Sequence, residues 1–169
     1  MTKLKPNNRK TSRFNINVLK YASCVFMFFP SVVSAQTVTT DQNFSFGKFA
    51  LLDFLNVENI DIASGGTVTK TSDIFFIDDP QRGIYTVTDG PPLTNYTVSI
   101  TDSDDLLIPG TLGTSMSLKN IQSGPENKRT DVNGEAQFWL YGRLETRGNM
   151  SYQDQTLTRN IEIEIIFDN

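Results

Sequence analysis

Short runs in which apolar and polar residues alternate dominate the chain from about residue 44 onward, and helical periodicity is nearly absent. The clearest runs are residues 96–100, 136–144 and 161–167. Successive side chains of a strand point to opposite faces, so this pattern is typical of half-buried antiparallel strands. We expect the apolar sides of these runs to share one core, made of Tyr96, Val98, Ile100, Phe138, Leu140, Ile161, Ile163 and Ile165.

Turn-forming residues separate these runs from shorter strand candidates. Gly, Pro, Asn and Asp gather at residues 64–66, 78–80, 89–92, 109–110, 123–125 and 133–134. The shorter candidate strands are residues 44–46, 67–70, 74–77, 84–88, 106–108 and 115–118. Residues 49–62 fit either a bent strand pair or a short helical turn. Many short strands separated by turns predict an all-β, antiparallel β-sandwich or barrel.

The N-terminal 35 residues have the composition of a secretory signal peptide. They hold six Lys or Arg and no Asp or Glu, followed by an apolar run at 21–33 and the small residues Ser34 and Ala35. A basic region, a short apolar region and a small-residue cleavage site together define such signals. We expect cleavage between Ala35 and Gln36, a flexible polar segment at 36–43 and one domain at 44–169. The apolar run is too short to span a bilayer, so the exported chain is expected to have no integral membrane segment.

The net charge of the exported chain and the residue types that it lacks exclude several classes of function. Without residues 1–35 the chain keeps nine basic against 19 acidic residues, a net charge of −10. Binding to nucleic acid depends on Lys and Arg that neutralise phosphates, so we expect no nucleic-acid partner. The chain has no His, and its one Cys, Cys24, lies in the signal. A lipid-modified Cys24 is disfavoured, because the apolar run follows it. No His- or Cys-based catalytic or metal site can form, so we expect no enzyme activity and no cofactor.

Acidic residues form the remaining candidates for chemistry. Asp102, Asp104 and Asp105 follow the strand at 96–101 and could offer oxygen ligands to a cation, but the glycine and glutamate of a full calcium loop are missing. A solvated turn explains the same cluster. Glu162 and Glu164 alternate along the last strand. They could be a glycosidase pair, or charges on an outer face that discourage edge aggregation.

Two aromatic residues form the candidate interaction face. Trp139 and Tyr141 lie opposite the apolar side of their strand, where they could stack on a sugar ring or fill an interface. A second buried face of the sheet is the alternative. Three glycosylation sequons, which begin at Asn43, Asn95 and Asn149, are expected by chance in a chain rich in Asn, Ser and Thr.

The serial order of motifs resembles a bacterial family of exported proteins. The motifs are the Phe-Ser-Phe-Gly of residues 44–47, the Gly-Gly-Thr-Val of 65–68, the run from Gly83 to Pro91, and the closing Gly134 to Leu144. In this order they resemble domain-of-unknown-function family 4402. The resemblance implies an immunoglobulin-like β-sandwich exported by a Gram-negative bacterium, with kinship to pilin-type and spore-coat-U-like subunits. It implies no catalytic residues. The closing turn departs from the family at Tyr141 and at residues 153–154.

Two functions remain open from the sequence. The first is a structural or surface-assembly protein, pilin-like or coat-like, which associates with itself or with other surface subunits in the periplasm or at the cell surface. The edge we favour for this is the last strand, 161–167, because an unpaired strand edge accepts a partner strand. The alternative is a periplasmic carbohydrate- or peptide-binding module that uses Trp139 and Tyr141. A hydrolase that uses carboxylates alone is the least favoured.

Overall fold

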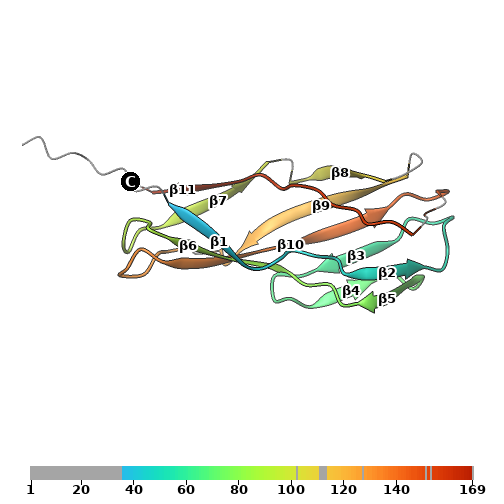
Figure 1. Ribbon diagram of the computed structural model, residues 1–169, viewed down its shortest axis with the longest axis horizontal. Helices are drawn as coiled ribbons and strands as arrows, with labels where there is room; N and C mark the ends of the chain where they lie inside the picture. Colours follow the sequence, from blue (N-terminus) through green and yellow to red (C-terminus); the bar gives the residue numbers. More distant parts are fainter. Residues whose placement is uncertain are drawn as a thin grey trace, which may run out of the picture. The chain divides into compact units, whose positions relative to one another are not determined.

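A computed structural model describes residues 36–168 except 102, 111–113, 127, 151 and 153. Within these residues the protein is all-β and antiparallel (Figure 1). The strands are β1 (Thr37–Gln42), β2 (Lys48–Leu51), β3 (Asn59–Ile62), β4 (Val68–Lys70), β5 (Ile74–Asp78), β6 (Gly83–Thr88), β7 (Tyr96–Ile100), β8 (Asp105–Pro109), β9 (Ser115–Gly124), β10 (Ala136–Thr146) and β11 (Ile163–Phe167).

Strand β10 organises the large sheet of seven strands. One edge of β10 pairs first with β6 (Ala136–Leu140) and then with β3 (Gly142–Glu145), while its other edge pairs with β9. The sheet continues to β1 beside β6, to β4 beside β3, and to β8 beside β9. One long strand therefore joins two consecutive halves of the same sheet.

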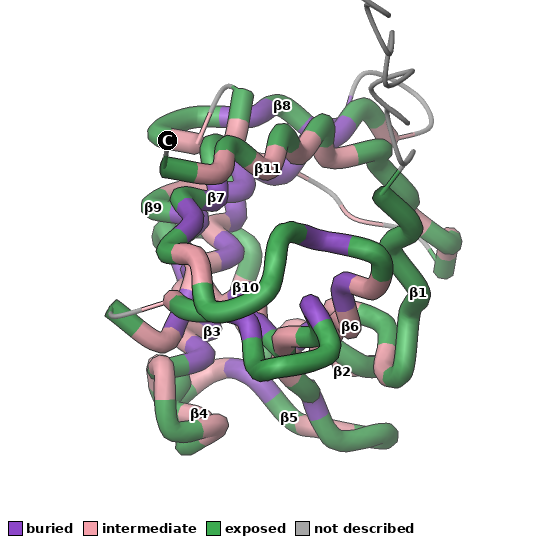
Figure 2. Tube along the Cα trace, turned by 90° about the vertical axis from the view of Figure 1, so that its left-hand side faces the viewer, coloured by how far each residue is buried: buried purple, intermediate pink, exposed green. Residues whose placement is uncertain are grey.

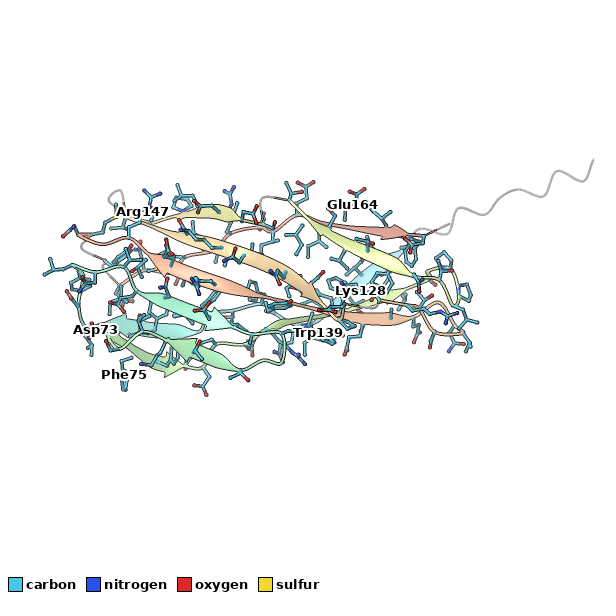
Figure 3. The ribbon with its side chains drawn as sticks, turned by 180° about the vertical axis from the view of Figure 1, so that it is seen from behind. Asp73, Phe75, Lys128, Trp139, Arg147 and Glu164 are labelled. Atoms are coloured by element: carbon cyan, nitrogen blue, oxygen red, sulfur yellow. The ribbon has the colours of Figure 1, made fainter. Side chains whose placement is uncertain are left out.

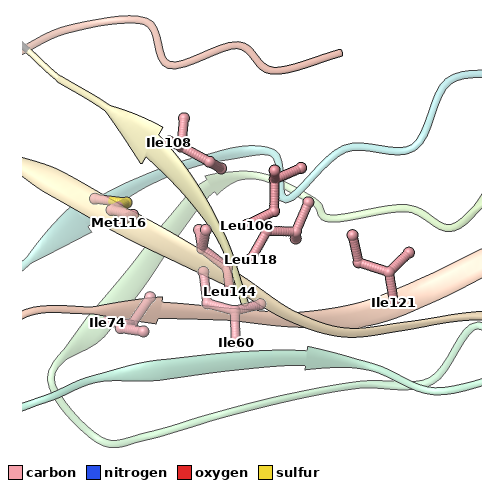
Figure 4. Packing of buried hydrophobic residues seen from close by; sticks show 8 residues of the cluster. All are labelled: Ile60, Ile74, Leu106, Ile108, Met116, Leu118, Ile121 and Leu144. Atoms are coloured by element: carbon pink, nitrogen blue, oxygen red, sulfur yellow. The ribbon is translucent and has the colours of Figure 1, made fainter. Parts of the chain in front are cut away.

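Two separate two-stranded sheets, which we call ribbons, form the second layer. The β7–β11 ribbon packs its Tyr96 and Val98 with Val87, Phe138 and Leu140 of the large sheet. The β2–β5 ribbon packs over the second cluster, made of Ile60, Ile74, Leu106, Ile108, Met116, Leu118, Ile121 and Leu144 (Figure 4). We call these regions the β7–β11 half and the β2–β5 half.

The expected core is confirmed in part and divided in two. Phe138 and Leu140 have no exposed surface, and Tyr96 and Val98 are buried beside them. Ile100, Ile163 and Ile165 pack against this cluster but stay half-buried. Ile161 packs against the other cluster, so the prediction of a single core is wrong. The alternation of β11 is confirmed from Ile163, where the strand begins.

Most of residues 36–43, which we expected to be a flexible polar segment, belong to a strand. Residues 37–42 form β1, which pairs with β6 although its side chains are exposed along nearly its whole length (Figure 2). Backbone hydrogen bonds hold this strand, so apolar alternation gave no signal for it. Conversely, residues 44–46 are not a strand, because only Ser45 forms a bridge, to Gln81.

Residues 49–62 contain parts of two strands and the bend between them. The residues are thus strands and not a helical turn, with β2 ending at Leu51 and β3 beginning at Asn59, but the two strands belong to different sheets and do not pair with each other. The predicted signal peptide, Cys24 and the cleavage position at Ala35 lie outside the described residues or at their boundary. Over the described part of the chain, no helix is long and apolar enough to cross a membrane.

Candidate functional site

Trp139 lies on the outer face of β10 and is held by three other segments (Figure 3). Its indole N–H donates to Ser64 Oγ at 3.1 Å, in the turn between β3 and β4. The Arg82 guanidinium lies 4.7 Å from the ring centroid, at a distance typical of a cation–π contact. Gly124 of β9 lies under the indole edge, where a Cβ would come within 2.3 Å of Nε1. Through these contacts Trp139 links the β3–β4 turn, the segment before β6 and the end of β9.

Tyr141 has a more open environment than Trp139. Its hydroxyl donates to Gln122 Oε1 at 2.9 Å, and its side chain lines a shallow cleft of about 430 Å³. Lys128 also lines this cleft, and burial lowers the pKa of its ammonium group. Trp139 and Tyr141 thus share one face of β10, but the Arg82 guanidinium lies over the indole of Trp139.

Two of the three acidic candidates that follow β7 lie among the described residues. Asp102 lies outside the described residues, Asp104 is exposed, and Asp105 begins β8 opposite Lys119. Lys119 itself pairs with Glu145 at 2.5 Å, and this hydrogen bond raises the pKa of the lysine. Among the described residues, no group of three or more His, Cys, Asp or Glu side chains is arranged to hold a metal ion.

The remaining carboxylates to be considered are either exposed to solvent or hydrogen-bonded within the fold. Glu162 and Glu164 are exposed, as the outer-face interpretation predicts. Glu58, which the sequence did not single out, is only 4% exposed and accepts a hydrogen bond from the Thr71 hydroxyl. Its backbone N–H donates to Thr146 Oγ1 at 2.8 Å. These bonds tie the loop before β3 to the end of β10.

A groove lies in the β2–β5 half, beside a free strand edge. Among the described strands, β2 pairs with β5 alone. Because Leu52 N–H donates to Asp73 O, the alternate amides of Phe49 and Leu51 point toward the other edge of β2. Along that edge runs a groove of about 1120 Å³, into which buried side chains of the core open: Ile108, Met116, Leu118 and Leu144.

Residues 154–161, which we call the strap, form the opposite wall of this groove. They lie outside every β-ladder formed by the described residues. Leu157 and Ile161 pack against the core from the strap. Tyr152 anchors the chain just before it, since its hydroxyl donates to Ser115 O at 2.8 Å and accepts from Arg147 N–H at 2.7 Å. The groove thus has an apolar floor, one strand edge and one wall without ladder hydrogen bonds.

The sequence contained only a weak signal of this groove. The residues before Ile161 are polar apart from Leu157, so they resembled an ordinary loop. The Phe-Ala-Leu-Leu stretch at 49–52 was ambiguous because both its faces are apolar. Comparisons with known proteins add no assignment, because no family model, no curated protein and no solved structure matches the chain. The resemblance to family 4402 and its immunoglobulin-like fold stays a prediction.

Proposed function

We propose that the protein is an exported, non-enzymatic assembly subunit that binds an extended segment of a neighbouring subunit. The observation that carries the proposal is the groove beside the free edge of β2. An incoming strand gains main-chain hydrogen bonds from such an edge, and its alternate side chains gain burial in the apolar floor. Both requirements are met at one place, between β2 and the strap.

The edge of β11 is the other acceptor and the one that the sequence favoured. Strand β11 pairs only with β7, so its second edge is also free among the described strands. The groove beside β2 supports strand addition better, because the buried side chains of Ile108 and Leu118 open into it. A free strand edge beside apolar pockets provides main-chain hydrogen bonds and also selects the side chains of the incoming strand, whereas a strand edge alone provides only the hydrogen bonds.

A bulky side chain on the groove rim tests this function. Thr158 is exposed and lines the groove, so Thr158→Trp should obstruct insertion without disturbing the core. Thr97→Trp, on the exposed face of β7, is the matched control. We expect the control and the wild type, but not Thr158→Trp, to enter high-mass assemblies in native gels of cell extracts. All three proteins should keep the same unfolding midpoint.

Two results would contradict the proposal. One is a Thr158→Trp protein that assembles as the wild type does. The other is turnover of a glycan or ester by the purified protein that disappears in an Asp or Glu variant. Export itself is tested by N-terminal sequencing, which should find Gln36 first.

The alternative is a periplasmic carbohydrate- or peptide-binding module. The observation that favours it is the cleft beside Tyr141, where Gln122 and Lys128 offer polar groups next to an aromatic ring. Titration with neutral and acidic oligosaccharides should then give saturable binding that Tyr141→Ala removes. Trp139→Ala should act on stability instead, because its ring is already in contact with Arg82.

A further inference from the structure

The β2–β5 ribbon carries apolar side chains on both of its faces. Its inner face contributes Phe49, Leu51, Ile74 and Phe76 to the core. The cross-strand register places Ala50 opposite Phe75 on the outer face, and Leu52 lies on the same side. Ile77 is the extra residue of a bulge between Phe76 and Asp78 and is exposed, and Ala50 and Ile77 also border the groove. We call Ala50, Leu52, Phe75 and Ile77 the outer patch. Neither strand of the ribbon pairs with a further described strand, and Leu52, Phe75 and Ile77 are exposed.

The outer patch is well exposed. Leu52 is 69% exposed, Phe75 62% and Ile77 55%, and Figure 3 shows Phe75 directed away from the ribbon. Leu55 and Val57, in the loop that follows β2, are exposed too. Exposed apolar residues that are scattered singly need no explanation, but a contiguous group of them marks a contact surface.

Local hydrogen bonds fix this surface in advance. Asp53 Oδ1 accepts from Leu55 N–H at 2.9 Å, and Asp53 Oδ2 accepts from the Asn56 amide at 2.8 Å. Leu52 N–H donates to Asp73 O at 2.7 Å, which holds the loop to β5. A surface that is already ordered loses little conformational entropy when it is covered.

We propose that the outer patch binds the same patch of a second copy of this chain. A twofold axis along the strands, midway between β2 and β5, places β2 of each copy over β5 of the other. Ala50 of one copy then faces Phe75 of its partner. The twofold axis produces this contact between a small and a large side chain twice in the dimer. Isologous contacts of this kind are the commonest in symmetric oligomers, and aligned sheets pack face to face in this way.

The charges beside the patch fit the same axis. Lys48 lies opposite Asp78 at one end of the ribbon, beyond the bulge, and both side chains are exposed and border the groove as well. Neither forms an ion pair with another described residue. Rotation about the axis brings Lys48 of each copy over Asp78 of the other. A rim of both signs is self-complementary, although the chain as a whole is acidic and would otherwise repel itself.

Sedimentation velocity of the full chain, expressed with its own N-terminal segment, tests the surface. We expect a reversible dimer whose population rises with concentration. Phe75→Asp should raise the dimer dissociation constant by about 100-fold or more, because it removes an aromatic anchor from both sides of the interface. Leu107→Asp on β8, where the leucine is 44% exposed, is the matched control and should leave the constant unchanged.

Mixed charge variants test the axis. Lys48→Asp places Asp over Asp in its own dimer, and Asp78→Lys places Lys over Lys, so each variant alone should be monomeric. An equimolar mixture brings Asp over Lys at both contacts and should form a 1:1 dimer. Proximity of residues 48 and 78 within one chain cannot produce this rescue. The proposal is overturned if the wild type stays monomeric at every concentration, if Phe75→Asp dimerises like the wild type, or if the mixture stays monomeric.

Discussion

The β7–β11 half and the β2–β5 half share strand β10 and close their cores in different ways. In the β7–β11 half, β11 pairs with β7 over five residue pairs, and Phe138 and Leu140 are fully buried beneath them. In the β2–β5 half, the strap closes the core without entering any ladder of the described strands. Both ribbons therefore keep a free edge among the described strands, but the edge of β2 lies beside an apolar groove, whereas the core under β11 is closed by a strand ladder.

Because of this difference, we expect the β7–β11 half to contribute mainly to the stability of the fold and the β2–β5 half mainly to association with other chains. Backbone groups that are paired and covered stabilise a fold and offer nothing to a neighbour, but a free edge is available to another chain. The free edge of β2 and the exposed outer patch belong to the same ribbon. Variants in the two halves should accordingly fail in different ways, in unfolding for one half and in assembly for the other.

The largest effect on stability should come from the paired half. Phe138 has no exposed surface and stacks on Tyr85 with ring centroids 5.2 Å apart. Phe138→Ala removes this contact and leaves a cavity, so we expect a loss of about 3–5 kcal/mol in the free energy of unfolding. Urea denaturation measures the loss. A change below about 1 kcal/mol would mean that this half is not the stable one.

Trp139 tests whether the halves are coupled. Its contacts with Ser64 and Arg82 join the β3–β4 turn to the segment before β6. Trp139→Ala should lower the free energy of unfolding by about 2 kcal/mol, because packing and a cation–π contact are both lost. Tyr141→Ala on the same face should cost less than about 1 kcal/mol. Equal losses in thermal unfolding would show that Trp139 has no joining role.

Two half-buried apolar residues compare the ladder with the strap directly. Ile165 belongs to β11, and Leu157 belongs to the strap. We expect Ile165→Ala to cost about 2 kcal/mol, since ladder hydrogen bonds prevent its neighbours from closing the cavity. Leu157→Ala should cost less than about 1 kcal/mol, because its side chain already borders an open groove. Chemical denaturation of both variants measures the difference, and the reverse order would contradict the comparison.

The smallest effect concerns the turn before β10. Asp131 Oδ1 accepts from the backbone N–H of Glu135 at 2.9 Å and of Asn133 at 2.8 Å. These bonds lower the pKa of Asp131 below its ordinary value of 3.8. Its contribution to stability is therefore complete above pH 3.8 and is lost as the pH falls through the lower folded-state pKa.

Comparison of Asp131→Asn with the wild type over a pH series checks this sign. The variant should be slightly less stable than the wild type at neutral pH, and the two curves should converge in acid. A difference that grows as the pH falls would exclude the assigned hydrogen bonds as its cause. Because the turn is exposed and remote from the groove, assembly should not change.

The sequence predicted the paired half better than the open half. Alternation identified β7, β10 and β11 because each of these strands has one apolar and one polar face. It missed β1, whose side chains are exposed and polar. It also placed Trp139 correctly on the outer face of β10, yet the hydrogen bond to Ser64 joins residues 75 positions apart. Contacts over such separations depend on the topology of the sheet, which a local pattern does not encode.

The groove was missed for a related physical reason. One side of the groove is the edge of β2 that no described strand pairs with, and a local sequence pattern does not show which edges stay unpaired. The other side is the strap, whose polar sequence resembles that of any loop. Only the register of β2 against β5 reveals which amides, those of Phe49 and Leu51, are directed to the free edge. The outer patch was likewise hidden, since apolar residues on both faces of β2 gave no clear period.

Residue-resolved hydrogen exchange tests the central claim most directly. It compares the free protein with the assembly recovered from cells. In the free protein, the amides of Phe49 and Leu51 should exchange rapidly, while Leu52, bonded to Asp73, exchanges slowly. In the assembly, Phe49 and Leu51 should become protected and β11 should not change. New protection confined to β11, with Phe49 and Leu51 still exchanging rapidly, would contradict the account.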